Sequence, residues 1–382
     1  MTPRWYLSLA VLAVVLALGV IVLGAYVRLS QAGLGCPDWP GCYGHITVPH
    51  TQQAVARADA RYAARPVQAA RAWKEMIHRY FAGSLAVLIL VLAVTAWWMR
   101  IAYRIKNPSP SGRGEGERAQ PVVLPSLALL TVIFQALLGM WTVTLLLFPP
   151  VVMGHLLGGY LTLALLILLA LQAGSWWRAA DGAGTALRWL AAATLVVLVL
   201  QVALGGWTSS NYAGIACPDF PTCQSQWWPP MDFRDAFAWH GLGPDYQGGI
   251  LNDPARVAIH VTHRLGALLT FILVIVSGLF FIFRSGRPAL KWLGGLAMLL
   301  VICQALIGVS MVHFALPLAL TDAHTGVAAL LLATVVAWNW SVWAKSAALT
   351  GLPVAGQSGR TPGQQLPAGR TARDGLPFTA SK

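Results

Sequence analysis

The sequence is poor in charge. Lys, Arg, Asp and Glu together make up 10% of its 382 residues, whereas hydrophobic residues make up 57%. Soluble globular domains carry about 25% charged residues, because their surfaces face water. So little charge excludes an ordinary soluble globule and indicates a protein whose solvent is lipid.

Acidic residues are scarcer than basic ones. There are 13 Asp and Glu against 26 Lys and Arg, which gives a formal net charge of +13. A basic balance is typical of nucleic-acid binding, but here the basic residues lie in short blocks between apolar runs. Such blocks orient membrane helices and contact anionic lipid. We therefore expect membrane lipid as a partner, and no nucleic acid.

Cysteine is also scarce, with five in the chain. Four of them form two close pairs, Cys36 with Cys42 and Cys217 with Cys223. Each pair encloses five residues, two of which are proline, and this spacing can close a small disulfide loop. The pairs could staple their loops or exchange with an external reductant, and the sequence leaves both interpretations open.

Long apolar runs dominate the rest of the chain. A transmembrane helix needs about 20 mostly apolar residues. The first run is too long for the apolar region of a signal peptide, so we count it as a span. Phe148-Pro149-Pro150 predicts a tight reversal, because proline blocks helix continuation. The sequence therefore predicts an all-α integral membrane protein of eight transmembrane helices, at about 5–27, 78–99, 122–148, 151–173, 186–207, 258–283, 289–313 and 319–343.

The distribution of Lys and Arg predicts the orientation of these helices. The larger share lies on the inner side if the N-terminus is cytoplasmic, and the C-terminus is then cytoplasmic too. The cysteine pairs fall on the outer side, where an oxidising compartment permits disulfides. The outer loop from Ser209 to Val257 is expected to fold over the outer surface. We expect the link Asn107 to Pro121 to be flexible and the tail 346–382 to be disordered.

The chain repeats itself once. The segment Cys36 to Cys42 returns as Cys217 to Cys223, 181 residues later, and Gln135-Ala136-Leu137-Leu138-Gly139 returns as Gln304-Ala305-Leu306-Ile307-Gly308, 169 residues later. An even number of helices in each repeat makes both halves cross the membrane in the same sense. We therefore predict two tandem, pseudo-symmetric four-helix bundles, residues 1–173 and 174–345.

Four histidines follow the same repeat. His78 and His155 in the first half return as His263 and His324 in the second, each near the outer end of a span. A single histidine in a helix is most often a packing residue, but that interpretation does not explain four at matched positions. Polar side chains at membrane depth usually mark function. We predict that histidines from two neighbouring helices in each half bind haem iron; zinc is less favoured because it prefers three or four close ligands.

Glu75 lies three residues before His78, on the same helical face. It could accept a proton or hold a substrate group, or it is a helix-start residue favoured by the helix dipole. The matching residue in the second half is His260, so the repeat is broken here, which predicts one reactive and one supporting half. Arg79 and Arg264 directly follow histidines and could bind haem propionates or anchor the helices at the membrane interface.

These motifs together resemble the haem A synthase family. They are Glu75-Met76-Ile77-His78-Arg79, the two Cys-Pro-Asp-aromatic-Pro-X-Cys loops, Ile259-His260-Val261-Thr262-His263-Arg264, His155 and His324. The resemblance covers about residues 5–343, and the motifs are specific in combination. It implies an oxidoreductase that oxidises the C8 methyl of haem O to a formyl group, giving haem A for cytochrome oxidase, with water as the oxygen source.

The resemblance also implies residue roles. Glu75 matches the catalytic acid, and the cysteines match the family's disulfide loops. His78 and His155 match the axial ligands of the substrate and product, haem O and haem A. His263 and His324 match the ligands of a bound haem b that relays electrons.

Partners and location follow from the same resemblance. Haem O synthase and cytochrome oxidase assembly factors are expected partners, together with an electron donor or acceptor that the sequence does not identify; a homo-oligomer stays open. No mitochondrial transit peptide precedes the first span, so we expect the bacterial cytoplasmic (inner) membrane. Two alternatives use the same histidines: a dihaem b-type carrier that oxidises quinol, which has no use for Glu75, and a haem transporter or assembly chaperone that binds haem without converting it.

Overall fold

The computed structural model describes residues 3–106, 121–174 and 184–343. Eight of the described helices are long and apolar enough to cross a membrane, which confirms the all-α membrane fold. These long helices are α1 (Arg4–Leu29), α3 (Ala69–Lys106), α4 (Val123–Thr144), α5 (Pro149–Ala173), α6 (Thr185–Ser210), α8 (Asp253–Arg284), α9 (Pro288–His313) and α10 (Leu318–Trp343). The short elements are α2 (Gln52–Arg61), the 3₁₀ turn η1 (Ala213–Ile215) and α7 (Phe233–Ala236).

Two predicted boundaries are wrong. The apolar run at 78–99 is only the middle of α3, because the helix continues into polar turns at both ends. The third span does not reach residue 148: α4 ends at Thr144, and Leu146 and Leu147 take left-handed backbone angles, with φ of 52° and 62°. Pro149 and Pro150 then open α5, since proline fits the first turn of a helix. The chain does reverse direction between these helices as predicted, but leucine residues form the turn and the two prolines begin the next helix.

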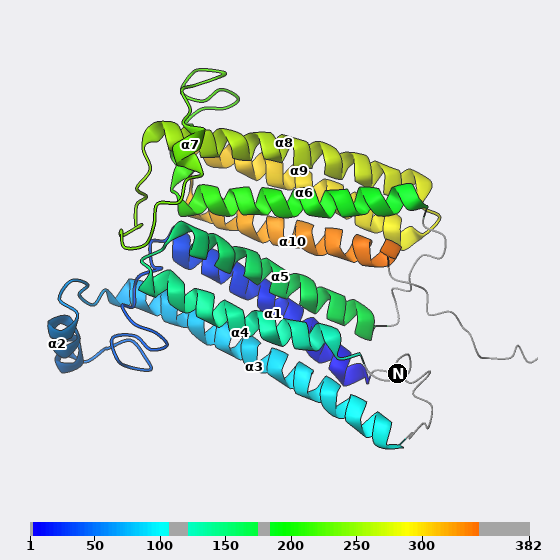
Figure 1. Cartoon of the computed structure of the whole chain (residues 1–382), viewed down its shortest axis with the longest axis horizontal. Helices are drawn as coiled ribbons and strands as arrows, with labels where there is room; N and C mark the ends of the chain where they lie inside the picture. Colours follow the sequence, from blue (N-terminus) through cyan, green and yellow to red (C-terminus); the bar gives the residue numbers. More distant parts are fainter. Residues whose placement is uncertain (1–2, 107–120, 175–183, 344–382) are drawn as a thin grey trace, which may run out of the picture. The chain divides into compact units, whose positions relative to one another are not determined.

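The long helices pack as two closed rings of four. In the first ring, α1 and α4 each contact both α3 and α5. In the second ring, α6 and α9 each contact both α8 and α10. The rings meet where α10 packs against α1 and α5, and where α5 packs against α6 (Figure 1). Because of this order, α3 stands opposite α5 and α8 stands opposite α10.

Apolar side chains fill the space between helices and also cover the outside of the bundle. Tyr6, Phe281 and Trp338 are fully buried between helices. In contrast, Phe283 and Trp292 are 77% and 80% exposed on helices that carry few charges. Outward apolar side chains of this kind suit a lipid environment. The helical backbone suits it too, because a helix satisfies its own hydrogen bonds.

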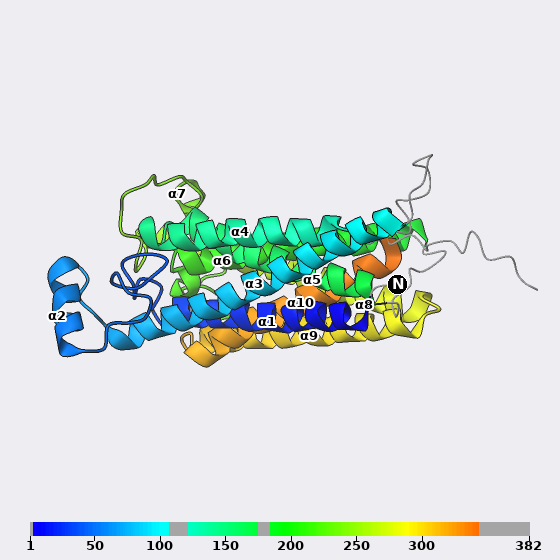
Figure 2. The same cartoon turned by 90° about the horizontal axis from the view of Figure 1, so that it is seen from below.

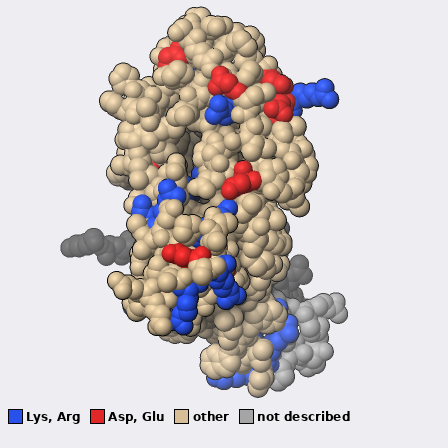
Figure 3. Space-filling model, turned by 90° about the vertical axis from the view of Figure 1, so that its left-hand side faces the viewer, with Lys and Arg blue, Asp and Glu red and all other residues tan. Residues whose placement is uncertain are grey.

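The connections that carry the cysteines lie at one end of the helices, with α2 and α7 (Figures 1 and 2). Charged side chains gather at this end (Figure 3). The second long loop folds back over helix ends as expected, and it covers the turn between α4 and α5. There the backbone N–H of Tyr246 donates to the carbonyl oxygen of Leu146 at 3.1 Å, and Trp239 packs edge-on against Phe148.

Two sequence predictions concern segments outside this description. The link after α3, predicted to be flexible, falls on residues 107–120, and the tail 346–382, predicted to be disordered, lies beyond residue 343. Both lie outside the described residues.

Candidate functional site

The four patterned histidines form two pairs inside the two rings. His78 on α3 and His155 on α5 belong to the first ring, and His263 on α8 and His324 on α10 belong to the second. The prediction that each pair comes from neighbouring helices is wrong, because each pair comes from helices that stand opposite each other in a ring. Histidines on opposed helices of one ring of four suit a flat group held from both sides.

Each of these imidazole rings lies against a glycine on the long helix before it. The tightest approach is at Gly24, where an added Cβ would come within 2.8 Å of the His78 ring, closer than side-chain atoms tolerate. The other glycines leave 3.2–3.4 Å. The pairs are Gly24 with His78, Gly139 with His155, Gly205 with His263 and Gly308 with His324. Gly24 therefore leaves room that the His78 ring needs, and the other three glycines let the imidazoles pack closely against the neighbouring helix.

The four imidazoles suit haem iron better than a bare metal ion. The Nδ1 atoms of His78, His155 and His324 are buried and have no hydrogen-bond partner in the described part of the chain. Each of these three residues keeps part of its surface exposed. Among the described residues no three His, Cys, Asp or Glu side chains gather to hold a bare metal ion. Two opposed imidazoles per site suit haem iron, whose other ligands come from the macrocycle.

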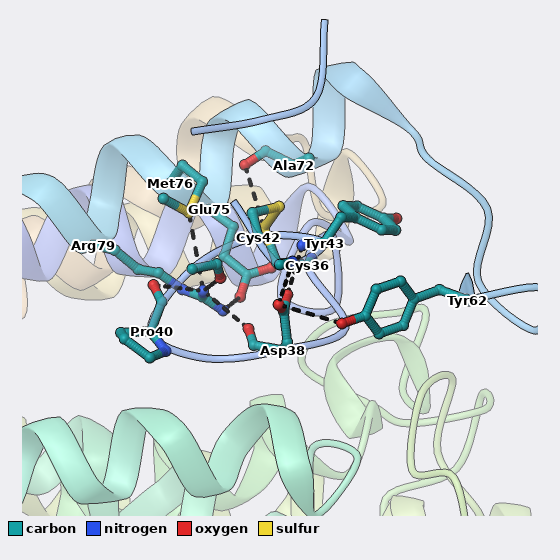
Figure 4. Close-up of a disulfide and its surroundings, with 12 residues drawn as sticks. Cys36, Asp38, Pro40, Cys42, Tyr43, Tyr62, Ala72, Glu75, Met76 and Arg79 are labelled. Atoms are coloured by element: carbon teal, nitrogen blue, oxygen red, sulfur yellow. Dashed lines mark hydrogen bonds and ion pairs between the residues drawn. A yellow bond between two sulfur atoms is a disulfide. The ribbon is translucent and has the colours of Figure 1, made fainter. Parts of the chain in front are cut away.

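Glu75 is buried at the loop-bearing end of the first ring, with 5% of its surface exposed. One carboxylate oxygen accepts a hydrogen bond from the backbone N–H of Cys36 at 2.9 Å, and the other lies 2.5 Å from Nη2 of Arg79 (Figure 4). The two contacts come from different parts of the chain. They hold the carboxylate one helical turn from His78.

Arg79 also fastens the first cysteine loop. Its Nη1 donates to the carbonyl oxygens of Asp38 at 3.0 Å and Pro40 at 3.2 Å, and also to that of Gly41 (Figure 4). A guanidinium offers five N–H donors in a rigid fork, so one side chain can bind a loop backbone and a carboxylate together. The predicted contact of Arg79 with a haem propionate stays a prediction.

Arg264 does the same for the second cysteine loop. It donates to the carbonyl oxygens of Thr222 and Asp219 at 2.8 Å and of Cys217 at 3.2 Å. His260 occupies the position that corresponds to Glu75, and within the described residues Arg264 has no ion pair like that of Arg79 with Glu75. Nδ1 of His260 bonds the carbonyl oxygen of Ala213 at 3.0 Å instead.

Both cysteine pairs are joined as disulfides, Cys36 with Cys42 and Cys217 with Cys223. The aspartate inside each loop accepts hydrogen bonds from backbone N–H groups that follow the second cysteine. For Asp38 the donors are Tyr43 and Gly44, and for Asp219 they are Gln224 and Ser225. The hydroxyl of Thr222 also donates to Asp219, and this bond is the largest cause that lowers the pKa of the Asp219 carboxyl.

A family model, described as COX15-CtaA, cytochrome oxidase assembly protein, matches residues 7–336. The chain belongs to this family. It is 42% identical to a haem A synthase of Shewanella oneidensis over 350 residues, which cover 91% of this chain and 98% of that protein. Haem A synthases of Halalkalibacterium halodurans and Bacillus licheniformis are 25% and 23% identical, over 80% and 83% of this chain and 87% and 89% of their own lengths. These matches confirm the resemblance inferred from the motifs.

Sequence reasoning missed two parts of this candidate site. The first is the set of glycines that face the histidines; a signal was present, because Gly24 and Gly205 are separated by the same 181 residues as the cysteine loops. The second is the contact between Glu75 and the backbone N–H of Cys36. No side-chain pattern could reveal that contact, because its donor is a peptide group.

Proposed function

We propose that this chain is a haem A synthase, an oxidoreductase that converts the C8 methyl of haem O to the formyl group of haem A. The observation that carries the proposal is the buried carboxylate of Glu75, held by Cys36 and Arg79 one turn from His78. A carrier or a transporter needs histidines but has no use for a buried acid beside them. The 42% identity to a haem A synthase over nearly the whole chain supports the same reaction.

We further propose that the two halves divide the work. The first half, residues 1–173, would bind haem O between His78 and His155. The second half, residues 174–345, would bind haem b between His263 and His324. When bound, haem b supplies one-electron transfer. The opposed helices and the glycines that face the histidines support two such sites.

Glu75 would act as the base of the reaction. Converting a methyl to a hydroxymethyl group with an oxygen from water releases two electrons and two protons. A second such oxidation, followed by loss of water, gives the formyl group. The carboxylate is placed to accept a proton as the oxygen–carbon bond forms, while Arg79 and the N–H of Cys36 orient it. The electrons would leave through the second half to an external acceptor.

In the orientation we propose, the disulfide loops face the outer side of the bacterial inner membrane and both termini are cytoplasmic. The excess of Lys and Arg on the opposite side supports it. The substrate site then lies near the outer leaflet, where an apolar haem O can enter from lipid. Haem O synthase would supply this substrate, and cytochrome oxidase assembly factors would receive the product.

The test is haem extraction and chromatography from membranes that contain this chain and a haem O producer. Haem A should appear when the chain is present and be missing without it. Haem O left unchanged, with haem b bound to the purified protein, would overturn the proposal in favour of an electron carrier.

A further inference from the structure

The repeat is broken at a second place, next to the histidine ligands. Gln201 on α6 lies four residues before Gly205, the glycine that faces His263. Its amide nitrogen is 3.1 Å from Nδ1 of His263 and donates to the backbone oxygen of the same residue at 3.1 Å. One glutamine therefore touches both the ring and the backbone of His263.

This contact depends on a glycine of the neighbouring helix. Gly266 lies three residues after His263 on α8, and an added Cβ there would come within 2.3 Å of Oε1 of Gln201. Any side chain at residue 266 would displace the amide. Gln201 and Gly266 thus form a matched pair across α6 and α8 that serves His263.

His78 in the first half lacks this pair. Gln135 and Gly158 do meet beside His155, but Nδ1 of His155 has no hydrogen-bond partner in the described part of the chain. The residue 181 positions before Gln201 is Val20, and the residue three after His78 is Phe81. Neither offers a polar atom to an imidazole, and Nδ1 of His78 is buried without a hydrogen-bond partner in the described part of the chain. The glycine contact is present on both sides, at Gly24 and Gly205. Only the amide is missing.

We propose that Gln201 is a positioning residue that holds His263 as a permanent haem ligand, whereas Val20 leaves His78 as the ligand that lets haem go. The inference rests on the proposed function, in which haem b stays bound and haem O must leave as haem A. A hydrogen bond to the second nitrogen of a ligating histidine fixes the ring and strengthens the ligand. If Nε2 of His263 bound the iron, Nδ1 would carry the proton. The amide of Gln201, whose nitrogen makes both contacts with His263 here, would then turn its oxygen toward the ring to accept that proton.

The test measures haem transfer from the purified full-length protein, in detergent, to apo-myoglobin. In the wild type, haem O or haem A should leave faster than haem b. Gln201→Val should lose haem b about 10- to 100-fold faster, which is the usual effect of removing a partner behind a metal ligand. The electron paramagnetic resonance signal of low-spin ferric haem b should also shift in this variant, because that signal reports the orientation of the axial imidazoles. Gln201→Glu keeps an acceptor and should restore both readouts.

Gln304→Val is the matched control. Gln304 corresponds to Gln135 in the repeat and lies four residues before the glycine that faces His324, yet its Oε1 has no hydrogen-bond partner in the described part of the chain. Its replacement removes the same amide from the same ring of helices and should leave the haem b transfer rate near that of the wild type. An equal acceleration in both variants would mean that packing, and not the contact with His263, explains the effect, and would overturn the proposal.

Adding the glutamine and the glycine to the first half tests the effect on haem release without altering the second half. Val20→Gln combined with Phe81→Gly installs the pair beside His78 and should slow the release of haem O or haem A about tenfold, since a single added partner is worth that much in affinity. Unchanged release there, or unchanged haem b transfer in Gln201→Val, would contradict the inference. A wild-type protein that binds no haem b at all would instead contradict the proposed function.

Discussion

The two disulfide loops are built alike, but different residues stand behind them. In each loop an aspartate accepts hydrogen bonds from backbone N–H groups. An arginine on a long helix, directly after a histidine, donates hydrogen bonds to the carbonyl oxygens of the loop. Behind the first loop Arg79 also pairs with the buried Glu75, whereas behind the second loop His260 bonds a carbonyl oxygen. The parts that shape the loops are duplicated. The buried acid that could move a proton is present only behind the first of the two loops.

The largest expected effect on haem A formation comes from Glu75, which has no acidic counterpart behind the second loop. Glu75→Gln keeps the size of the side chain and removes its charge, so it should lower haem A formation by about 10²- to 10⁴-fold, the usual contribution of a proton-transfer group. Haem content in the purified variant should stay at the wild-type level. His260→Gln is the control in the second half, and a loss of haem A formation as large as that in Glu75→Gln would break the comparison.

Opening the two disulfides should separate stability from activity. Both loops close over a sequence separation of six, so the paired variants Cys36→Ala/Cys42→Ala and Cys217→Ala/Cys223→Ala should each lose about 2 kcal/mol of stability. Opening the first loop should also lower haem A formation by about tenfold, because the backbone N–H of Cys36 holds Glu75 through a charge-assisted hydrogen bond. Opening the second loop should not lower haem A formation in this way.

Thermal unfolding and product analysis on the same samples measure both quantities. Equal losses of haem A formation in the two paired variants would show that the first loop has no special link to Glu75.

Replacing the arginines tests whether they act mainly on the loops. Arg264→Met should destabilise the second loop by about 2 kcal/mol, because it removes hydrogen bonds from a charged group to three carbonyl oxygens. Arg79→Met should do the same to the first loop and also lower haem A formation, since Glu75 loses its partner. Limited proteolysis of each loop and product analysis distinguish the two outcomes; an Arg264→Met loop as protease-resistant as the wild type would contradict this account.

The smallest expected effect concerns Asp219 in the second loop. That loop has Thr222 at the position where the first loop has Gly41. Hydrogen bonds to its carboxylate lower the pKa of Asp219, so their contribution is present above the ordinary aspartate pKa of about 3.9 and is lost as the pH falls through the lower folded value. Thr222→Val should move this pKa back toward its ordinary value. A carboxyl titration of ¹³C-labelled aspartates measures the change, and an unshifted Asp219 would show that the hydroxyl contributes nothing.

Most of the helices could be predicted from sequence, because apolar length alone identifies a span. The ends of α3 and α4 could not. The first turns of α3 carry Lys74 and Glu75, whose charge hides a helix from a hydropathy pattern, and the turn before α5 is made of Leu145, Leu146 and Leu147, which are as apolar as the helices.

The histidine pairs and Glu75 could also be selected from the sequence, since repeated positions and one broken match require no coordinates. Which helices oppose each other could not, because ring order depends on contacts between residues far apart in the chain. The carbonyl contacts of Arg79 and Arg264 were likewise hidden, since a backbone acceptor leaves no trace in the residue pattern.

The division of labour between the two halves is tested most directly by haem analysis of the purified His263→Ala protein, made with a haem O producer present. This account predicts that haem b is missing while haem O is still bound, and that His78→Ala gives the opposite result. Haem b retained in His263→Ala, or both haems lost in each variant alike, would contradict it.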